Sequence, residues 1–203
     1  TIKMDTSITD INTNTTNMYY VETVDKEYYY TKKIILTIPQ KSLLDLIGLK
    51  EITHLLNGVT AVSLCRIYAL YDTCWYKDII KTTTDNNIRC FIPIENNDNK
   101  SLAMISYTDS GYASMWNNIY KISRELLIEK VHDNLMELYP DIKIPKALYY
   151  NLHFWDSGIH LWKPGVNPEK SYDLIIKPFP NKNVYIGGEA YSSNQGWIEG
   201  ALD

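Results

Sequence analysis

The residues with the clearest chemical potential lie in the closing segment of the chain, Val184–Asp203. Residues 184–186 have the apolar character of a buried strand, and Gly187–Gly188 allow the backbone to approach a ligand closely. The hydroxyl of Ser192 or Ser193 is suited to cap a helix that begins after it. Free N–H groups at such a helix start favour an electron-rich ligand. The spacing is therefore typical of a cofactor-binding turn, although many α/β proteins place strand, glycine turn and helix in this order for packing alone.

The order of residues in the closing segment is more specific than its pattern of elements. Gly-Gly-Glu-Ala at 187–190 is followed by Gly-Trp-Ile-Glu-Gly-Ala-Leu at 196–202, and together they closely resemble the C-terminal motif of flavin-dependent amine oxidases. The Gly-Trp pair is most similar to that of L-amino-acid oxidases. In this superfamily, which also includes monoamine and polyamine oxidases, the glutamate region lies along the ribityl-pyrophosphate of FAD, and the later helix start faces the flavin ring. The resemblance implies FAD as cofactor, with contacts from Gly188, Glu189, Gly196, Trp197 and Ile198.

Residues 151–162 carry a second part of the resemblance. This segment is similar to the family's run of a tryptophan, a glycine and an aromatic residue just before the last FAD strand, and Trp155 matches the tryptophan on the flavin side. The position two after the glycine, which is usually an aromatic wall of the substrate site, is His160, and Trp162 follows on the same alternating face. With Trp197 as the first wall, the resemblance implies Trp197, His160 and Trp162 as catalytic-site residues. Core packing is the alternative for the tryptophans, and a partly buried structural histidine is the alternative for His160.

Aromatic walls suit the chemistry that this resemblance implies. Oxidation of an amine by flavin moves a hydride equivalent from the carbon beside nitrogen to the flavin, while the protein mainly positions the substrate and excludes water. Aromatic side chains hold the reacting carbon in place and lower the local dielectric, which favours the neutral amine. No nucleophile or metal is required, and we predict no metal site. The expected enzyme is an FAD-dependent oxidoreductase that acts on an amine or an amino acid.

One position departs from the family pattern. Most relatives carry a lysine ten residues before a tryptophan, on the strand that enters the substrate domain, where it holds a water near the flavin. Counting back from Trp75 gives Cys65. Arg66 is adjacent, but successive side chains of a strand face opposite sides, so we expect Arg66 to point away from the flavin. Because a cysteine lacks the lysine's fixed positive charge, we expect a weak oxidase, or a dehydrogenase that uses another acceptor.

The N-terminal part contains short strand signals followed by a helix. Strands are expected at residues 19–23, 28–30 and 34–36, as a meander that Pro39 closes. A short helix is expected from Ser42 to Ile47. This arrangement resembles the second FAD-domain segment of the same oxidases. The resemblance implies that backbone groups near its start hold the adenine, and the best-matching position is Ile8.

The middle of the chain alternates strand signals with one long helix signal. Strands are expected at Leu64–Tyr71, Arg89–Ile94 and Leu102–Tyr107, with a turn within Glu95–Lys100. Apolar residues recur at helical spacing over Asn118–Tyr139, and Pro140 ends that helix. The charged residues between them, including Arg124, are expected on its solvated face.

These signals predict an α+β or α/β protein with a partial flavin amine oxidase fold: a mixed-sheet substrate domain and a discontinuous FAD-binding domain. The expected segments are 1–48 for FAD binding, 49–150 for substrate binding and 151–203 as the return that completes the flavin site. No Gly-x-Gly-x-x-Gly occurs, so the N-terminal Rossmann βαβ, whose glycines admit a pyrophosphate, is absent from this chain. We therefore expect a C-terminal part whose partner is the missing N-terminal FAD-binding half.

The composition further limits the class of protein that this chain can belong to. With 203 residues, 45% of them hydrophobic, and a net charge of -4, the chain supports a substantial core and shows no nucleic-acid footprint. No apolar run approaches the roughly 20 residues that cross a bilayer, and the start at Thr1 lacks signal-peptide features. We expect a cytoplasmic or other intracellular protein without a membrane partner. The cysteines, 65, 74 and 90, indicate buried thiols, with a disulfide as the alternative.

Two other functions compete with the oxidoreductase. The first is a catalytically silent structural or binding protein on the same scaffold, which the absent dinucleotide half and the absent lysine favour. The second is a small-molecule binding module that keeps an aromatic pocket without redox chemistry. The substrate class is also open, because an amino acid needs an arginine for its carboxylate. Arg89 is the candidate for that role, and an unanchored amine is the alternative.

Overall fold

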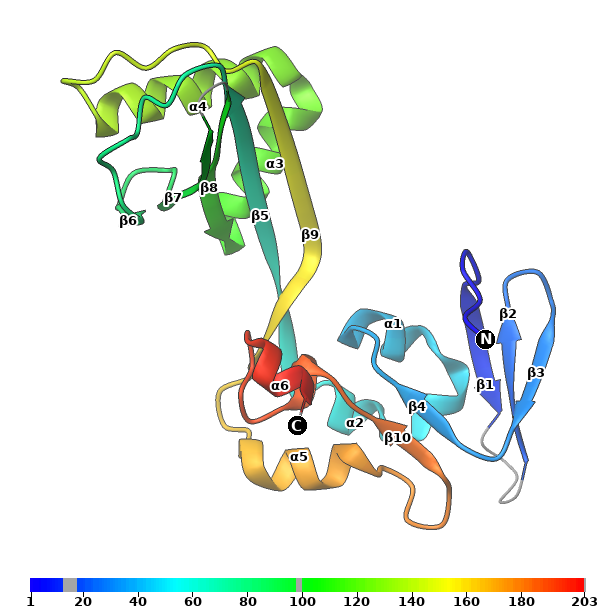
Figure 1. The fold of residues 1–203 in the computed structure, drawn as a ribbon. Coiled ribbons are helices and arrows are strands. Elements are labelled where there is room, and N and C mark those ends of the chain that lie inside the picture. Colours follow the sequence, from blue (N-terminus) through cyan, green and yellow to red (C-terminus); the bar gives the residue numbers. More distant parts are fainter. Residues whose placement is uncertain (13–17, 98–99, 203) are drawn as a thin grey trace. The chain divides into compact units, whose positions relative to one another are not determined.

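The computed structural model describes residues 1–12, 18–97 and 100–202, and it has a mixed α+β architecture with several sheets (Figure 1). The expected α+β class is confirmed at this level. The chain divides into two compact units. Unit 1 comprises Thr1–Ala61 and Ile159–Asp203, and unit 2 comprises Val62–Gly158. Unit 1 is thus discontinuous in sequence.

Unit 1 contains two sheets. The first is antiparallel, with β1 (Ile8–Asn12), β2 (Tyr19–Thr23) and β3 (Tyr28–Thr31) in that order. The expected third strand of the meander, β4 (Ile34–Leu36), instead pairs in parallel with β10 (Val184–Ile186). The expected strands are therefore present, but the meander ends at β3. The reason is burial, because Ile34 and Leu36 enter the same core as Val184 and Ile186.

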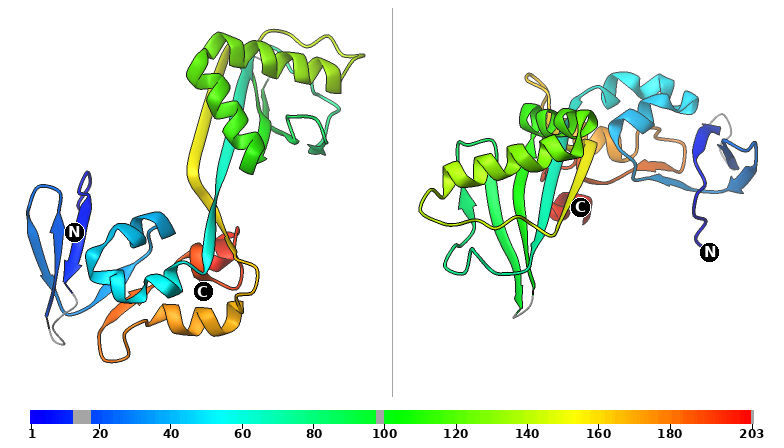
Figure 2. Two further views of the ribbon diagram at one scale, coloured as in Figure 1. Left: turned by 180° about the vertical axis from the view of Figure 1, so that it is seen from behind. Right: turned by 90° about the horizontal axis from the view of Figure 1, so that it is seen from above.

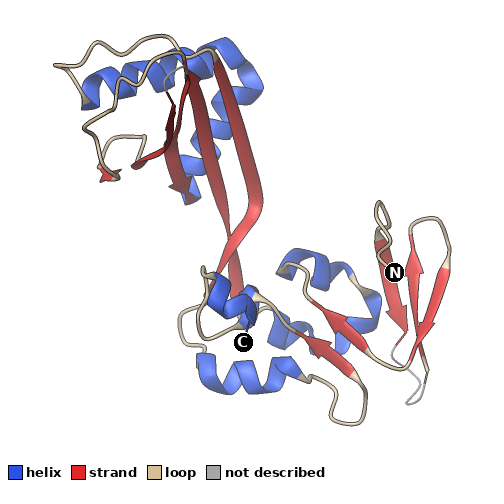
Figure 3. Ribbon diagram, viewed as in Figure 1, coloured by secondary structure: helices blue, strands red, loops and turns tan. Residues whose placement is uncertain are grey.

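The helices of unit 1 are short, and all but the last contribute buried side chains to the core around this parallel pair (Figure 3). They are α1 (Gln40–Asp45), the 3-10 helix η1 (Ile47–Ile52), α2 (Thr53–Leu56), α5 (Pro168–Ile176), the 3-10 turn η2 (Glu189–Tyr191) and α6 (Ile198–Leu202). The first begins two residues before the expected start, directly after Pro39.

The units divide the chain at different residues from the expected segments 1–48, 49–150 and 151–203. Leu49, Ile52 and Leu56 are buried in the core of unit 1, which carries the first boundary on to residue 61. The second boundary falls after Gly158, within β9. The first segment of unit 1 therefore extends to residue 61, because side chains of residues 49–59 are buried in the core of that unit.

Unit 2 is built on a five-stranded sheet in the order β6-β7-β8-β5-β9. Its strands are β6 (Thr82–Thr83), β7 (Cys90–Asn97), β8 (Lys100–Asp109), β5 (Val59–Tyr71) and β9 (Tyr149–Trp162). The expected hairpin of the second and third predicted strands is confirmed as β7 and β8. Asp98 and Asn99 of its predicted turn lie outside the described residues.

Helices cover one face of this sheet (Figure 2). Residues Ala113 and Trp116 of the first helix, α3 (Ser110–Ile122), are buried against Cys65, Ile67 and Ala69 of β5. The second helix, α4 (Arg124–Leu138), adds Leu127, Val131 and Leu135 to the same core. Alternate residues of β5 consequently lie on the opposite, helix-free face.

The single helix expected over Asn118–Tyr139 is wrong, because the chain forms two helices that meet at Ser123. Ser123 has an extended backbone (φ -161°, ψ 135°), and its Oγ accepts a hydrogen bond from the N–H of Leu126 at 3.1 Å. This is an N-cap, which starts a new helix and ends the previous one. The apolar spacing continues across the break, so periodicity alone did not reveal it.

All three cysteines are free thiols. Cys65 is buried as expected, whereas Cys74 and Cys90 are partly buried. None of the helices in the described ranges has the length and apolar character needed to cross a bilayer.

Replacing Ser123 tests the break between α3 and α4. Ser123→Ala removes the capping acceptor, so the free energy of unfolding should fall by about 0.5–2 kcal/mol in urea titrations. Ser123→Asp keeps a capping oxygen and should stay near wild type. Equal stability of the alanine variant and wild type would show that the cap does not hold α4.

Candidate functional site

The closing segment turns sharply after β10. The N–H of Gly187 donates to the carbonyl of Leu36 at 2.9 Å, which extends the parallel pairing by one residue. Gly188 then adopts φ +102°, a backbone conformation that side chains disfavour, and leads into η2. A Cβ on Gly188 would come no closer than 3.9 Å to Thr37, so the conformation rather than crowding requires glycine here.

Glu189 holds the loop that follows this turn. Its Oε1 accepts hydrogen bonds from the backbone N–H of His160 at 2.9 Å and of Gly196 at 2.8 Å. Its Oε2 accepts from Nδ1 of His160 at 2.9 Å. Burial raises the pKa of Glu189, but the hydrogen bonds from His160 and Gly196 outweigh it, so the pKa lies below its ordinary value. Both carboxylate oxygens are therefore hydrogen-bonded within the protein, which leaves the backbone of Glu189 for a cofactor contact.

His160 lies at the centre of this network and is only 3% exposed. Because Nδ1 donates to Glu189 and Nε2 accepts from the backbone N–H of Gln40 at 3.4 Å, the partners match a neutral imidazole with its proton on Nδ1. The amide of Gln40 in turn donates to the carbonyls of Leu56 and Val59 at 2.9 and 2.8 Å. His160 thus links β9, α1 and the closing segment, and these are the contacts of a positioning residue.

Trp162 faces the same segment as His160, as the alternation of β9 predicts. Its backbone N–H donates to Oε1 of Gln195 at 2.8 Å, and its indole Nε1–H donates to the carbonyl of Ser192 at 3.1 Å. The ring packs edge-on to Tyr191, with centroids 6.2 Å apart. Gln195 also donates to the carbonyl of Ala190 at 2.7 Å. Trp162 therefore packs beneath the closing loop, and its predicted role as a substrate wall stays a prediction.

A cavity of about 240 Å³ lies beside the glycine turn. It is lined mainly by apolar side chains, among them Ile35, Tyr185 and Tyr191, and by the backbone of Gly187 and Gly188. Of the predicted cofactor contacts, Gly188 is the one that lines this cavity.

The remaining predicted contacts of the closing segment stand on its surface. Gly196, with φ +82°, is exposed, and the side chains of Trp197 and Ile198 are 72% and 73% exposed. The helix that follows packs closely, since a Cβ on Gly200 would lie 2.2 Å from Oγ of Ser192 and 2.3 Å from the carbonyl of Asn194. The Oγ of Ser192 accepts from the N–H of Asn194 at 3.1 Å. Because α6 begins only at Ile198, neither Ser192 nor Ser193 stands at the N-cap position that was predicted for it.

Ile8, the predicted adenine contact, lies on β1 opposite Thr23 of β2. It lines a separate, open cavity of about 480 Å³ in unit 1 together with Val21 and Thr23. The pairing of β1 and β2 shifts register between Ile8 and Asp10. Asp10, which the sequence patterns did not single out, accepts from the N–H groups of Ile11 and Gly48 at 2.7 and 2.9 Å.

Trp155 belongs to unit 2, on β9, and is 42% exposed. The guanidinium of Arg66 lies over its ring, 5.9 Å from the centroid, whereas Cys65 is fully buried in the core beneath the helices. Cys65 and Arg66 thus lie on opposite faces of the sheet, as expected, and the expectation that Arg66 points away from the flavin stays a prediction. Strand alternation places Arg66, not Cys65, on the face of Trp155.

The environment of Cys65 explains its chemistry. Burial raises the pKa of the Cys65 thiol to about 12, with a smaller opposing effect from a hydrogen bond to Thr108, so Cys65 is an inert core thiol. The weak oxidase was expected because no positive charge stood on the predicted flavin side. Arg66 places a cation beside Trp155, and the weak oxidase stays a prediction.

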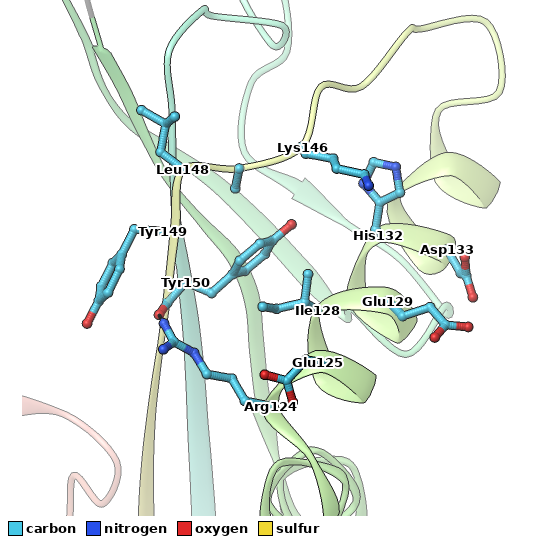
Figure 4. Close-up of a pocket in the computed structure, with 11 residues that line it drawn as sticks. Arg124, Glu125, Ile128, Glu129, His132, Asp133, Lys146, Leu148, Tyr149 and Tyr150 are labelled. Carbon is cyan, nitrogen blue, oxygen red and sulfur yellow. Dashed lines mark hydrogen bonds between the residues drawn. The ribbon is translucent and has the colours of Figure 1, made fainter.

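A further pocket of about 390 Å³ lies in unit 2 and contains none of the predicted site residues (Figure 4). One wall is formed by the helix α4 through Arg124, Ile128 and His132, and the other by residues 146–150. Arg124 donates to the carbonyl of Tyr150 at 3.1 Å and lies 5.4 Å from the ring centroid of Tyr149. In the described part of the chain, no three His, Cys, Asp or Glu side chains are placed to hold a metal ion.

Comparisons with known proteins leave the family open. No family model matches the chain. Its sequence is similar to that of an uncharacterized protein of Acanthamoeba polyphaga mimivirus, with 25% identity over 115 residues. This match covers 49% of the chain and 22% of the viral protein, so the chain spans less than a quarter of that protein's length.

Glu189 gives the network a pH dependence that can be measured. Because its pKa is lowered by folding, its contribution to stability is complete above the ordinary value of 4.5 and is lost as the pH falls below it. Glu189→Gln should lower the free energy of unfolding by about 1–3 kcal/mol at pH 7, with a smaller difference from wild type at pH 4. The exposed Glu199→Gln is the matched control, with little effect expected. An unchanged difference at the two pH values would contradict this role.

Gly200 tests the packing of the closing loop. In Gly200→Ala the added methyl group meets Ser192 and Asn194, so residues 192–202 should exchange amide hydrogens faster and the melting temperature should fall. Gly111→Ala is the control, because a Cβ at Gly111 in α3 meets nothing within 4 Å. That variant should be as stable as wild type or up to about 1 kcal/mol more stable. The same outcome for both variants would argue against close packing at Gly200.

Proposed function

We propose that the protein is an FAD-dependent oxidoreductase that oxidises an amine or an amino acid by hydride transfer to flavin, and that this chain forms its C-terminal part. The observation that carries the proposal is the geometry of the closing segment. Strand β10 ends in the left-handed turn of Gly188, and Glu189 then fixes the loop up to Gly196 through three hydrogen bonds. The residues that resemble the flavin motif thus form one ordered unit beside a cavity.

The cavity and its surroundings fit one part of FAD. Gly187 and Gly188 line the cavity, and neither carries a side chain of its own that would keep a ligand from its backbone. A volume of about 240 Å³ lies below the range of roughly 300–1,000 Å³ that is usual for a complete small-molecule site. The chain would therefore hold the cofactor together with other residues, with Gly188, the backbone of Glu189 and Gly196, Trp197 and Ile198 on its side.

The parallel pair β4–β10 indicates what those other residues would be. Parallel sheets are normally covered on both faces and contain more than two strands. Here Ile34 and Leu36 are buried, while Ile35, on the other face of β4, is 65% exposed. Within the described residues each of the two strands pairs only with the other. A strand–helix unit with a dinucleotide-binding turn, the missing N-terminal half, would extend this pair and cover Ile35.

In this proposal the residues of this chain bind the cofactor and position the loop that faces it. The bound flavin would accept the hydride equivalent, and the protein would exclude water from the reacting carbon. Trp197 and Ile198 offer exposed apolar surface for that purpose. Glu189 and His160 keep the loop that carries Trp197 in place, so we assign them to positioning rather than to contact with the substrate.

A catalytically silent structural or binding protein on the same scaffold is the second candidate. The observation in its favour is that His160 and Trp162, two of the three predicted catalytic residues, direct their polar groups into the protein. A scaffold needs these bonds as much as an enzyme does. Bound flavin and turnover separate the two candidates.

Flavin content of the full-length protein tests the proposal. The purified protein should show flavin absorbance, and Gly188→Ala should lose most of its bound FAD because φ +102° strains any side chain. Gly165→Ala is the matched control, since Gly165 also has a positive φ of +86° but contacts nothing that a Cβ would meet, and it should keep its FAD.

Turnover is then followed with amine and amino-acid panels, both by hydrogen peroxide release and with an artificial electron acceptor. Signal in the first assay indicates an oxidase, and signal only in the second indicates a dehydrogenase. A full-length protein without flavin bands that also fails to bind added FAD would overturn the proposal in favour of the scaffold.

A further inference from the structure

The pocket in unit 2 between α4 and residues 146–150 has no part in the function proposed above (Figure 4). Its volume of about 390 Å³ lies within the range of roughly 300–1,000 Å³ that is usual for small-molecule sites. All of its lining residues belong to unit 2. The pocket is therefore large enough to hold a ligand with residues of this unit alone.

The inner surface of this pocket is apolar. Figure 4 shows the side chains of Ile128 and Tyr150 pointing toward one another between the helix and the extended segment, and the half-buried Ala147 also lines this space. Tyr150 is 6% exposed and belongs to the core of unit 2. At one end Arg124 reaches across to the carbonyl of Tyr150 at 3.1 Å. A ligand in the pocket would thus place an apolar group against Ile128 and Ala147.

The other end of the pocket carries two nitrogen groups without partners. Figure 4 shows the side chain of Lys146 reaching toward the ring of His132. Within the described residues Lys146 forms no ion pair. The Nδ1 atom of His132 is buried and has no hydrogen-bond partner in that part of the chain. Because a buried polar atom is costly when it lacks a partner, this end of the pocket favours a ligand that supplies one.

The carboxylates on the neighbouring turns of α4 are already in use. The ammonium of Lys130 lies 3.9 Å from Glu129 and 3.5 Å from Asp133, and both carboxylates point away from the opposite wall of the pocket (Figure 4). Glu125, one turn earlier, accepts a hydrogen bond at 2.8 Å from the hydroxyl that caps α4. Among the described residues, the ammonium of Lys146 is therefore the charge at this end that an anion can pair with.

We propose that this pocket binds a phosphate monoester of a small apolar alcohol, with the phosphate at Lys146 and His132 and the apolar group against Ile128 and Ala147. The two nitrogen groups come from different elements and form no planar fork, so they suit a tetrahedral oxyanion better than a planar carboxylate. A phosphate has enough acceptor oxygens for both groups. Along α4, His132 and Ile128 are about 6 Å apart, which is the length of one phenyl group. The site is independent of the flavin proposed for unit 1.

Four probes test the two halves of the site. In calorimetric titrations of the full-length protein, phenyl phosphate should bind about tenfold more tightly than inorganic phosphate or phenol, because each of these fills only one half. Phenylacetate has a similar apolar group but a planar carboxylate, and it should bind more weakly than phenyl phosphate.

Two variants locate the binding. Lys146→Met should weaken the binding of phenyl phosphate about tenfold and leave that of phenol unchanged, because it removes only the charge. His132→Phe keeps a ring and should also weaken phenyl phosphate binding. The free energy of unfolding should not fall in this variant, since the nitrogen that it removes has no partner in the described chain. Lys143→Met removes an exposed lysine outside the pocket and is the matched control, with wild-type binding expected.

Several outcomes would overturn the proposal. These are no binding of phenyl phosphate by the folded wild type, equal affinity for phenyl and inorganic phosphate, and phenylacetate binding as tight as that of phenyl phosphate. Binding that survives unchanged in Lys146→Met, or that falls as much in Lys143→Met, would also overturn it. A protein without flavin that still binds phenyl phosphate as described would contradict only the oxidoreductase function.

Discussion

The carboxylate of Glu189 is the interaction on which the rest of unit 1 depends. One side chain accepts three hydrogen bonds, two from His160 and one from the N–H of Gly196, and so joins a strand, a glycine turn and an irregular loop. Even a partly buried carboxylate is costly to remove from water unless such donors surround it. His160 passes the constraint to Gln40, whose side chain reaches the end of α2 and the first residue of β5.

This network also shows which motif residues are bonded within the protein and which are available to a ligand. Residues that a motif suggests as ligand contacts need polar groups that remain available, yet Glu189, His160 and Trp162 have theirs in use. The surface left for a partner or cofactor consists of the glycine backbone at 187–188 and the exposed side chains that follow Gly196. In the proposed function this surface would be one side of a cofactor site, beside the two-stranded parallel pair.

In unit 2, strand alternation decides which side chains are buried in the core and which lie on the other face of the sheet. Because α3 and α4 cover one face of the sheet, residues 65–71 of β5 alternate between the apolar core and the helix-free face. Cys65 and Arg66 are neighbours in sequence and belong to these two environments, which makes one an inert thiol and the other a cation between two rings. The side chains on this face are consequently those of Arg66, Tyr68 and Leu70, opposite Tyr107, Met104 and Leu102 of β8.

Much of the local structure was determined by the sequence alone. Alternating apolar residues predicted most of the strands, the spacing of 184–188 predicted a strand that ends in a glycine turn, and the α+β class followed. These features depend on neighbours a few residues apart, through side-chain period and backbone preference. The break at Ser123 also depends on local interactions, because the Ser123 side chain caps α4. It was not predicted, since the apolar residues keep their helical spacing on both sides of the cap.

The candidate site, in contrast, was decided by tertiary structure. Nothing near Glu189 in sequence indicates that its carboxylate turns to His160, that β4 leaves its meander for β10, or that Trp155 meets Arg66. Each of these is a choice among distant hydrogen-bond or packing partners, and it depends on which groups the fold removes from water together. The sequence therefore supplied the residues that resemble a flavin site, and only the folded chain determined which of them hold the protein and which remain free to bind.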